Sequence, residues 1–116
     1  MNRRRQGAQG EALAVEYLKK KGYRILRQNY RYERDEIDII AQENETLVFI
    51  EVKARRSTNY GAPIEAVTES KQKTIRTVAE GYLTENEIED VSCRFDVVSI
   101  LYKNGKPEIE HYVDAF

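Results

Sequence analysis

Two carboxylates and a lysine in the middle of the chain have the types and spacing for metal-assisted chemistry on a phosphoryl group. Asp38 lies in the apolar run 36–41, and Glu51 and Lys53 lie in the apolar run 46–53. Mg²⁺ is commonly held by one or two carboxylates, with phosphate oxygens and water completing its coordination. Such an ion polarises the phosphoryl group and lowers the pKa of a bound water, while a nearby lysine stabilises developing negative charge. These residues therefore predict a Mg²⁺ (or Mn²⁺) site.

The two runs are expected to pair as an antiparallel hairpin, since a polar segment, 42–45, separates them and Asn44 tolerates the left-handed conformation of a tight turn. A turn centred just after Asn44 places Asp38 directly opposite Glu51. Side chains alternate along a strand, so Lys53 shares the face of Glu51. Facing carboxylates destabilise a sheet. A cation is therefore expected between them, supplied by a metal ion, by Lys53 or by both.

Glu11 is a third candidate acid, because it heads the apolar stripe of a predicted helix and should face the sheet. It would be a further metal ligand or would position the attacking water. A purely structural explanation exists for each residue taken alone: Asp38 and Lys53 as an ion pair at a sheet edge, and Glu11 as an acid favoured in a first helical turn. The combination of Asp38, Glu51 and Lys53 in one register favours the site.

The elements that position these residues follow from apolar periodicity. A helix is predicted over 8–21, with Gly22 as its stop. A second helix is predicted to be capped by Ser70 and to carry an apolar stripe from Ile75 to Tyr82. The order α-β-β-β-α-β-β predicts an α/β fold, a mixed sheet flanked by helices, in one domain over 1–116. Strands are expected at 23–31, 36–41, 46–53, 94–102 and 108–112.

Length and composition restrict the class of protein. A chain of 116 residues fits one domain. No apolar stretch approaches the ~18 residues of a membrane-spanning helix, and no signal region is visible, so a cytoplasmic protein without a membrane partner is expected. Cys93 is the only cysteine and is expected to be a small buried residue. His111 is the only histidine, which argues against a Ser/His/Asp triad or a His-rich zinc site.

The net charge of −1 hides an uneven distribution along the chain. Residues 1–34 carry a net charge of +7, and residues 35–116 carry −8. Charge runs can simply be solvated surface, but the basic N-terminal third also suits contacts with backbone phosphates. The near-neutral balance therefore excludes only a uniformly basic protein that binds nucleic acid by electrostatics alone.

Several ordered motifs resemble a known family. Asp38 followed after twelve residues by Glu51-Val52-Lys53 resembles the PD-(D/E)-x-K nuclease signature, in which an acid precedes acid-x-Lys on adjacent strands. Together with other segments it resembles the YraN family, a small, uncharacterised bacterial group assigned to the restriction-endonuclease-like fold and similar to archaeal Holliday junction resolvases. The resemblance runs from about residue 7 to 101, through Gly10-Glu11, Ala14, Tyr17-Leu18, Asn29-Tyr30-Arg31, 36–41, 48–55, Lys71-Gln72 and 94–98.

The resemblance implies a restriction-endonuclease-like α-β-β-β-α-β core, to which the last strand adds a C-terminal edge strand. It also implies metal-dependent hydrolysis of DNA phosphodiester bonds, on branched or damaged DNA. The family pattern differs at one position, where its usual glycine before the Glu-Ile-Asp run is Asp35. The implied catalytic residues are the acids Glu11, Asp38 and Glu51, the lysine Lys53, and Gln72, which matches a glutamine lining related sites.

DNA is the expected partner, and a homodimer is expected because one small domain presents one site while a duplex has two strands. Two other classes of function stay open. One is a non-catalytic, nucleic-acid-binding accessory protein that retains the nuclease fold. The other is a protein-interaction module that uses the acidic segment 85–90. The residues expected to contact nucleic acid are Arg3, Arg4, Arg5, Arg31, Arg55 and Arg56.

Overall fold

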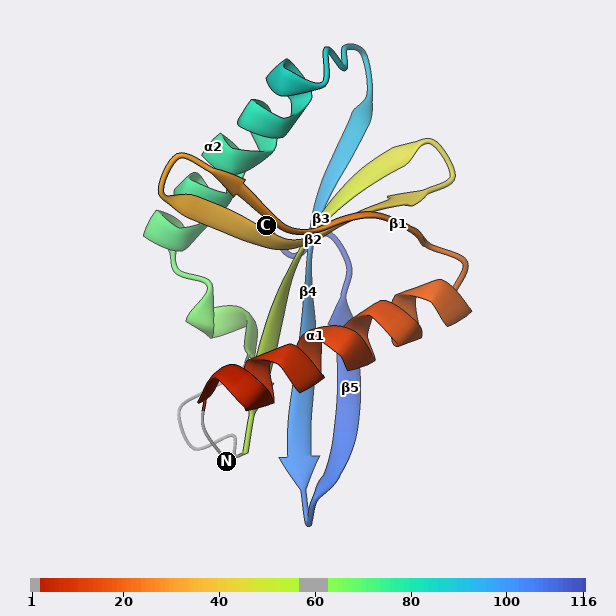
Figure 1. The fold of residues 1–116 in the computed structure, drawn as a ribbon, viewed down its shortest axis with the longest axis vertical. Helices are drawn as coiled ribbons and strands as arrows, with labels where there is room; N and C mark the ends of the chain where they lie inside the picture. Colours follow the sequence, from red (N-terminus) through yellow and green to blue (C-terminus); the bar gives the residue numbers. More distant parts are fainter. Residues whose placement is uncertain (1–2, 57–62) are drawn as a thin grey trace.

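The protein folds as one five-stranded mixed sheet with a helix on each face, which confirms the predicted α/β architecture with its C-terminal edge strand (Figure 1). The computed structural model describes residues 3–56 and 63–116. Strand order in the sheet equals strand order in the sequence; the third and fourth strands are parallel, and the other neighbours are antiparallel. The elements are α1 (Arg3–Lys20), β1 (Arg24–Tyr32), β2 (Asp35–Glu43), β3 (Thr46–Arg55), the 3₁₀ turn η1 (Pro63–Ala66), α2 (Glu69–Glu85), β4 (Ser92–Lys103) and β5 (Lys106–Tyr112).

The two helices cover opposite faces of the sheet and create two apolar cores. Under α1, Ala14, Val15 and Leu18 pack against buried residues of the three strands β2, β3 and β4. Under α2, Ile75 and Val78 pack against a second set that includes Phe49. Figure 1 shows α1 in front of the lower part of the sheet, where it crosses β4 and β5, and α2 packs on the other face. The site residues therefore lie between two packed layers.

The helix ends differ in part from the prediction. The stop of α1 is confirmed: Gly22 adopts a positive φ of 93° and its N–H donates to the Lys19 carbonyl. The helix begins at Arg3 rather than at residue 8, because the residues before 8 carry no apolar stripe that would reveal them. Helix α2 is capped by Thr68, whose side chain accepts the Lys71 N–H, and not by Ser70, which lies inside the helix.

The predicted register of the β2–β3 hairpin is confirmed, but the ladder of paired residues ends one pair before Asp38 and Glu51. The pairs run from Glu43–Thr46 to Ile39–Ile50. The next pair, Asp38–Glu51, was predicted and does not form, so that part of the prediction was wrong. The physical reason is a reversal in β2, where Ile37 packs in the α2 core and Ile39 in the α1 core. Residues two apart in a regular strand share a face, so the strand turns over at Asp38.

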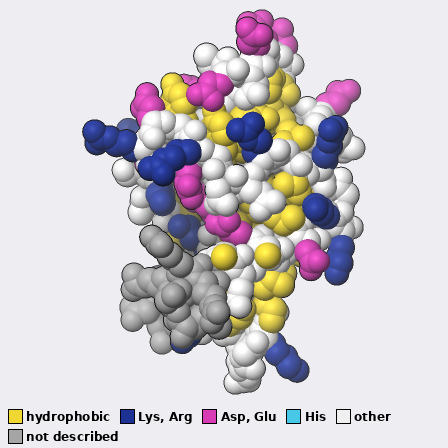
Figure 2. Space-filling view, viewed as in Figure 1, with side chains coloured by type: hydrophobic (Ala, Val, Ile, Leu, Met, Phe, Trp, Pro, Cys, Tyr) yellow, Lys and Arg dark blue, Asp and Glu magenta, His cyan; other side chains and the backbone are white. Residues whose placement is uncertain are grey.

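Cys93 is exposed rather than buried, as is Ser92 before it at the start of β4. Basic and acidic side chains are interspersed on the face shown in Figure 2. Within the described ranges, no helix is long and apolar enough to cross a membrane.

Gly81 is required where α2 meets β1. A Cβ added there would lie 2.5 Å from the ring of Tyr32. Alanine gains about 1 kcal/mol of helix propensity over glycine, but overpacking costs about 1–3 kcal/mol. We expect Gly81→Ala to lower the free energy of unfolding by about 1 kcal/mol in urea denaturation. Gly7→Ala is the control; nothing lies within 4 Å of its added Cβ, so it should be neutral or stabilising. Equal effects of the two changes would contradict this account.

Candidate active site

The candidate site lies where β2 and β3 separate, at the junction of two cavities. One cavity, of about 450 Å³, opens beneath α1 and is lined by Glu11 and Arg55 among others. The other, of about 360 Å³, opens beneath the first turns of α2 and is lined by Glu51 among others. We call them the α1-side and α2-side cavities. Asp38 and Lys53 line both, so these two side chains are at the centre of the site.

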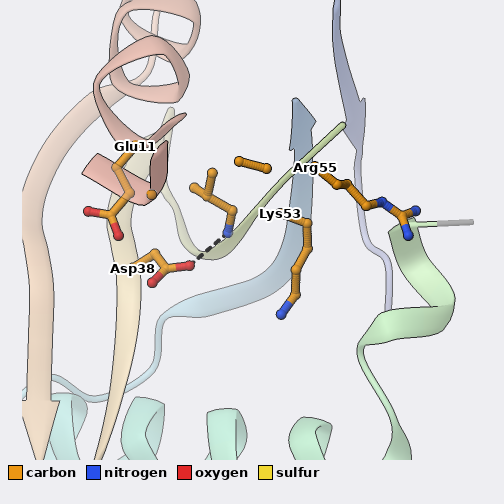
Figure 3. Close-up of a pocket in the computed structure, with 7 residues that line it drawn as sticks. Glu11, Asp38, Lys53 and Arg55 are labelled. Carbon is orange, nitrogen blue, oxygen red and sulfur yellow. Dashed lines mark hydrogen bonds between the residues drawn. The ribbon is translucent and has the colours of Figure 1, made fainter. Parts of the chain in front are cut away.

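Asp38 is held by the backbone of the neighbouring strand. Its Oδ2 accepts the Val52 N–H at 2.8 Å, a bond that takes the place of the missing Asp38–Glu51 pair. Burial raises the pKa of Asp38, and the Val52 N–H and the Lys53 ammonium only partly oppose this effect. Figure 3 shows the Asp38 and Glu11 carboxylates close to each other, from β2 and α1. Asp38 is thus a partly desolvated carboxylate whose orientation is fixed by the Val52 N–H.

Glu51 is the buried member of the pair, with 6% of its surface exposed. Burial, and then the charge of Asp38, raise its pKa to about 7, although Lys53 and Lys71 act in the opposite direction. Its Oε1 is buried and has no hydrogen-bond partner. An unsatisfied buried oxygen costs about 1–3 kcal/mol, and more if it is charged. Such an atom needs a proton or a cation beside it.

Glu11 approaches the site from α1. Burial and the neighbouring charges of Asp38 and Glu36 raise its pKa, and a hydrogen bond with the Asn29 side chain opposes the rise. Asn29 has a positive φ of 52°, which asparagine tolerates better than most residues. The predicted orientation of Glu11 toward the sheet is confirmed, since it lines the α1-side cavity with Asp38.

The donor set suits a hard divalent cation with few protein ligands. Asp38 and Glu51 supply carboxylate oxygens, and the unpartnered Oε1 of Glu51 is an acceptor with no competing donor. Within residues 3–56 and 63–116, no three or more His, Cys, Asp or Glu side chains are grouped so as to hold a metal ion. A cation here would therefore depend on water and phosphate oxygens for the rest of its coordination, as Mg²⁺ commonly does.

Other sequence-predicted residues lie outside this centre. Gln72 lines neither cavity, and its Nε2 donates to the Val67 carbonyl at 3.1 Å. Arg31 is exposed on β1 opposite Glu36 and does not itself line either cavity. Arg55 borders the α1-side cavity but points away from Glu11 and Asp38 in Figure 3. Arg56 is exposed and borders neither. The side chains of Arg3, Arg4 and Arg5 lie outside the described residues.

Two cations at the site were missed as site residues. Lys71, on α2, and Arg34, in the β1–β2 turn, both line the α2-side cavity with Glu51. Lys71 opposes the rise in pKa of both Asp38 and Glu51. The available signal was the position of Lys71 in the first turn of a helix that follows the acid-x-Lys strand. Arg34 offered no signal beyond its place in a charged turn.

The raised pKa of Glu51 makes the metal-free protein sensitive to pH. The folded state keeps its proton up to a pKa of about 7, whereas a glutamate in the unfolded chain titrates near ~4.3. Stability is therefore unaffected below the unfolded pKa, falls as pH rises between the two values, and stays lower above pH 7. We expect Glu51→Gln to raise the free energy of unfolding by about 1–3 kcal/mol at pH 8. Most of this gain should disappear at pH 5.

The measurement is chemical denaturation with chelator present at both pH values. Glu45→Gln is the matched control, since Glu45 is exposed in the hairpin turn and should change stability little at either pH. If the gain of Glu51→Gln is the same at pH 5 and pH 8, the burial argument fails.

Comparison with known proteins identifies the family. A family model described as uncharacterised protein family UPF0102 matches residues 10–100. A UPF0102 protein of Alkaliphilus oremlandii is 53% identical over 112 residues, covering 95% of this chain and 96% of that protein. One from Chlorobium limicola is 52% identical over 116 residues, covering 95% and 90%. The solved structure of Pyrococcus furiosus SfsA in complex with Ca²⁺ aligns with 95% of this chain and 63% of that chain, at 15% identity and a TM-score of 0.36. The chain therefore belongs to the uncharacterised protein family UPF0102, the YraN family that its motifs resemble.

Proposed function

We propose that this protein is a metal-dependent endonuclease that hydrolyses phosphodiester bonds in DNA, with branched or damaged DNA among its candidate substrates. The observation that carries the proposal is the junction of the two cavities, where Asp38, Glu51 and Lys53 meet and a buried oxygen of Glu51 has no partner. Two partly desolvated carboxylates repel the phosphate backbone of a nucleic acid, so they would weaken a surface that only binds it.

The residues have separate roles in this proposal. Asp38 and Glu51 would hold Mg²⁺ or Mn²⁺, with the Val52 N–H fixing the orientation of Asp38. The bound ion would polarise the scissile phosphoryl group and lower the pKa of a water. The charge of Lys53 acts to lower the pKa of both carboxylates. In the reaction, Lys53 would stabilise the negative charge that develops on the phosphate oxygens. Glu11, raised in pKa and open to the α1-side cavity, would orient the attacking water. A homodimer would bring two such sites to the two strands of a duplex.

The direct test is cleavage of supercoiled plasmid and of a synthetic four-way junction by the purified protein. We expect nicked or resolved products with Mg²⁺ or Mn²⁺ and none with chelator. Lys53→Ala should remove the activity, since it lacks the charge that stabilises the transition state. Equal residual cleavage by wild type and Lys53→Ala would mean a contaminating nuclease and would defeat the proposal.

The second candidate function is that of a non-catalytic accessory protein that binds nucleic acid. One observation favours it: in the described part of the chain, Glu11 does not form a three-carboxylate metal group with Asp38 and Glu51. It makes a different prediction. Salt-sensitive DNA binding would persist in the site variants and would weaken when Arg3, Arg4 and Arg5 become alanine.

A further inference from the structure

Three cations from three different elements surround the α2-side cavity. Arg34 comes from the β1–β2 turn, Lys53 from β3, and Lys71 from the first turn of α2. The cavity extends from these side chains to Asp38 and Glu51. It therefore connects the candidate reaction centre to a rim that carries Lys71 and Arg34, on the opposite side of the sheet from Glu11.

The rim cations are free to bind an anion. Lys71 and Arg34 are both exposed, and neither side chain has a hydrogen-bond or ion-pair partner among residues 3–56 and 63–116. Arg94, by contrast, is tied to Glu43 and Asp96. The backbone N–H of Lys71 already donates to Thr68 Oγ1 at 3.2 Å. An anion would therefore bind to the Lys71 ammonium and not to this backbone N–H at the start of α2.

The charge balance of the cavity makes anion binding conditional. The three cations face four acids, namely Asp35, Glu36, Asp38 and Glu51. An anion entering the metal-free cavity therefore meets at least as much negative as positive charge. A divalent cation at Asp38 and Glu51 would change the balance to net positive, because a bound ion is the largest local charge. Binding of a phosphate and of the metal should then support each other.

We propose that the α2-side cavity is a binding subsite for a second backbone phosphate of the DNA strand, next to the phosphate that reacts at Asp38 and Lys53, with Lys71 and Arg34 as its contacts. This inference rests on the proposed function, since it takes Asp38 and Lys53 as the reaction centre. Lys71 and Arg34 are positioning residues, which hold the strand in register with the reacting phosphate.

The test measures DNA binding and cleavage separately in Lys71→Ala and Arg34→Ala. Binding of a fluorescein-labelled duplex is followed by anisotropy in Ca²⁺ over a range of salt concentrations, with gels to check that the DNA stays intact. Each phosphate contact contributes about 0.9 to the slope of log affinity against log salt, so each variant should lose about one unit of slope. In cleavage with Mn²⁺, KM should rise about fivefold or more while kcat changes less than about twofold, the pattern of lost binding without lost chemistry.

Two variants control for general charge and for structure. Lys73→Ala removes an exposed lysine of the same helix that does not line the cavity and should leave slope and KM unchanged. Lys71→Arg keeps the charge and should restore the slope. Equal slopes and KM values for Lys71→Ala and Lys73→Ala would overturn the subsite.

The outcomes also separate the subsite from the proposed function. If Lys71→Ala loses slope while the wild type cleaves nothing in Mg²⁺ or Mn²⁺, the endonuclease proposal fails and the phosphate subsite stands. If the wild type cleaves DNA and Lys71→Ala behaves as wild type in both assays, the subsite fails and the nuclease stands. No DNA binding by the wild type, even with Ca²⁺, would overturn both.

Discussion

Asp38→Asn is expected to lower divalent-metal-dependent DNA cleavage by at least about a hundredfold, the scale of losing one preorganised electrostatic group. Asparagine has nearly the same shape, and its side-chain oxygen can still accept the Val52 N–H that Asp38 binds at 2.8 Å. What it lacks is the negative charge that would attract a metal ion to the junction of the cavities. The change also relieves the repulsion that contributes to the raised pKa of Glu51, so the protein should stay folded.

The control for this variant is Asp90→Asn. Asp90 is exposed and adopts a positive φ of 55°, a conformation that asparagine tolerates as readily as aspartate. This variant removes the same charge far from the cavities and should cleave like wild type. Cleavage assays with matched Mn²⁺ concentrations would measure the difference. Similar rates for Asp38→Asn and wild type would show that Asp38 has no part in catalysis.

Asp96→Asn is expected to lower the free energy of unfolding by about 3 kcal/mol or more, as for breaking a buried ion pair. The Asp96 side chain is fully buried. It accepts bonds from the Arg94 guanidinium at 2.9 and 3.0 Å, from the Asp114 N–H at 2.9 Å, and shares a 2.7 Å bond with His111 Nε2. Asparagine would place an N–H against these donors and leave Arg94 partly uncompensated.

The pKa of Asp96 sets the pH range in which this loss is visible. Burial works to raise it, but the bonds from His111, Arg94 and the Asp114 N–H outweigh burial and lower it. A carboxylate with a lowered folded pKa stabilises the fold above its unfolded pKa near ~3.9, and this contribution is lost as pH falls through the folded value. The gap between wild type and Asp96→Asn in denaturant unfolding should thus be full at pH 7 and shrink in acid.

Glu108→Gln is the matched control for Asp96→Asn. Glu108 forms an ion pair with Lys103 at 3.6 Å, with both side chains about 60% exposed. Exposed pairs contribute about 0–1 kcal/mol, so this variant should unfold close to wild type. Equal losses for the two variants would contradict the assignment of Asp96 as the anchor between β4, β5 and the C-terminal residues.

The sequence predicts the fold well because its strongest signals are local. Alternating apolar residues and Asn44 in the turn determine the β2–β3 register from Glu43–Thr46 to Ile39–Ile50. The register could not show where the ladder ends, because that depends on packing: Ile37 goes to the α2 core and Ile39 to the α1 core. This reversal at Asp38 joins the two cavities.

Sequence spacing predicted the central residues of the candidate site but not the cations at its rim, because only the central residues lie on neighbouring strands. Asp38, Glu51 and Lys53 lie on neighbouring strands, so their spacing along the chain translates into proximity. Lys71 and Arg34 approach from a helix and a turn, and their distance from the centre depends on how α2 packs on the sheet. Gln72, which follows Lys71, instead binds the Val67 carbonyl, since neighbouring residues on a helix point in different directions.

The roles of Arg94 and Asp96 could not be assigned from sequence. They lie in a motif that the family resemblance includes, and acids and arginines in such motifs are easily taken for catalytic residues. In the fold they form, with His111 and Glu43, a hydrogen-bonded network on the α1 face of β4 and β5, and none of them lines either cavity of the site. Their contribution is to stability.

Asp38 and Glu51 are proposed to hold one divalent cation together, and anomalous diffraction from crystals soaked in Mn²⁺ would detect that ion in place. We expect one anomalous peak between the Asp38 carboxylate and Glu51 Oε1, the buried oxygen without a partner, and no such peak in Asp38→Asn crystals grown and soaked in the same way. Manganese bound elsewhere with this position empty, or an equal peak in wild type and variant, would contradict the proposed metal site.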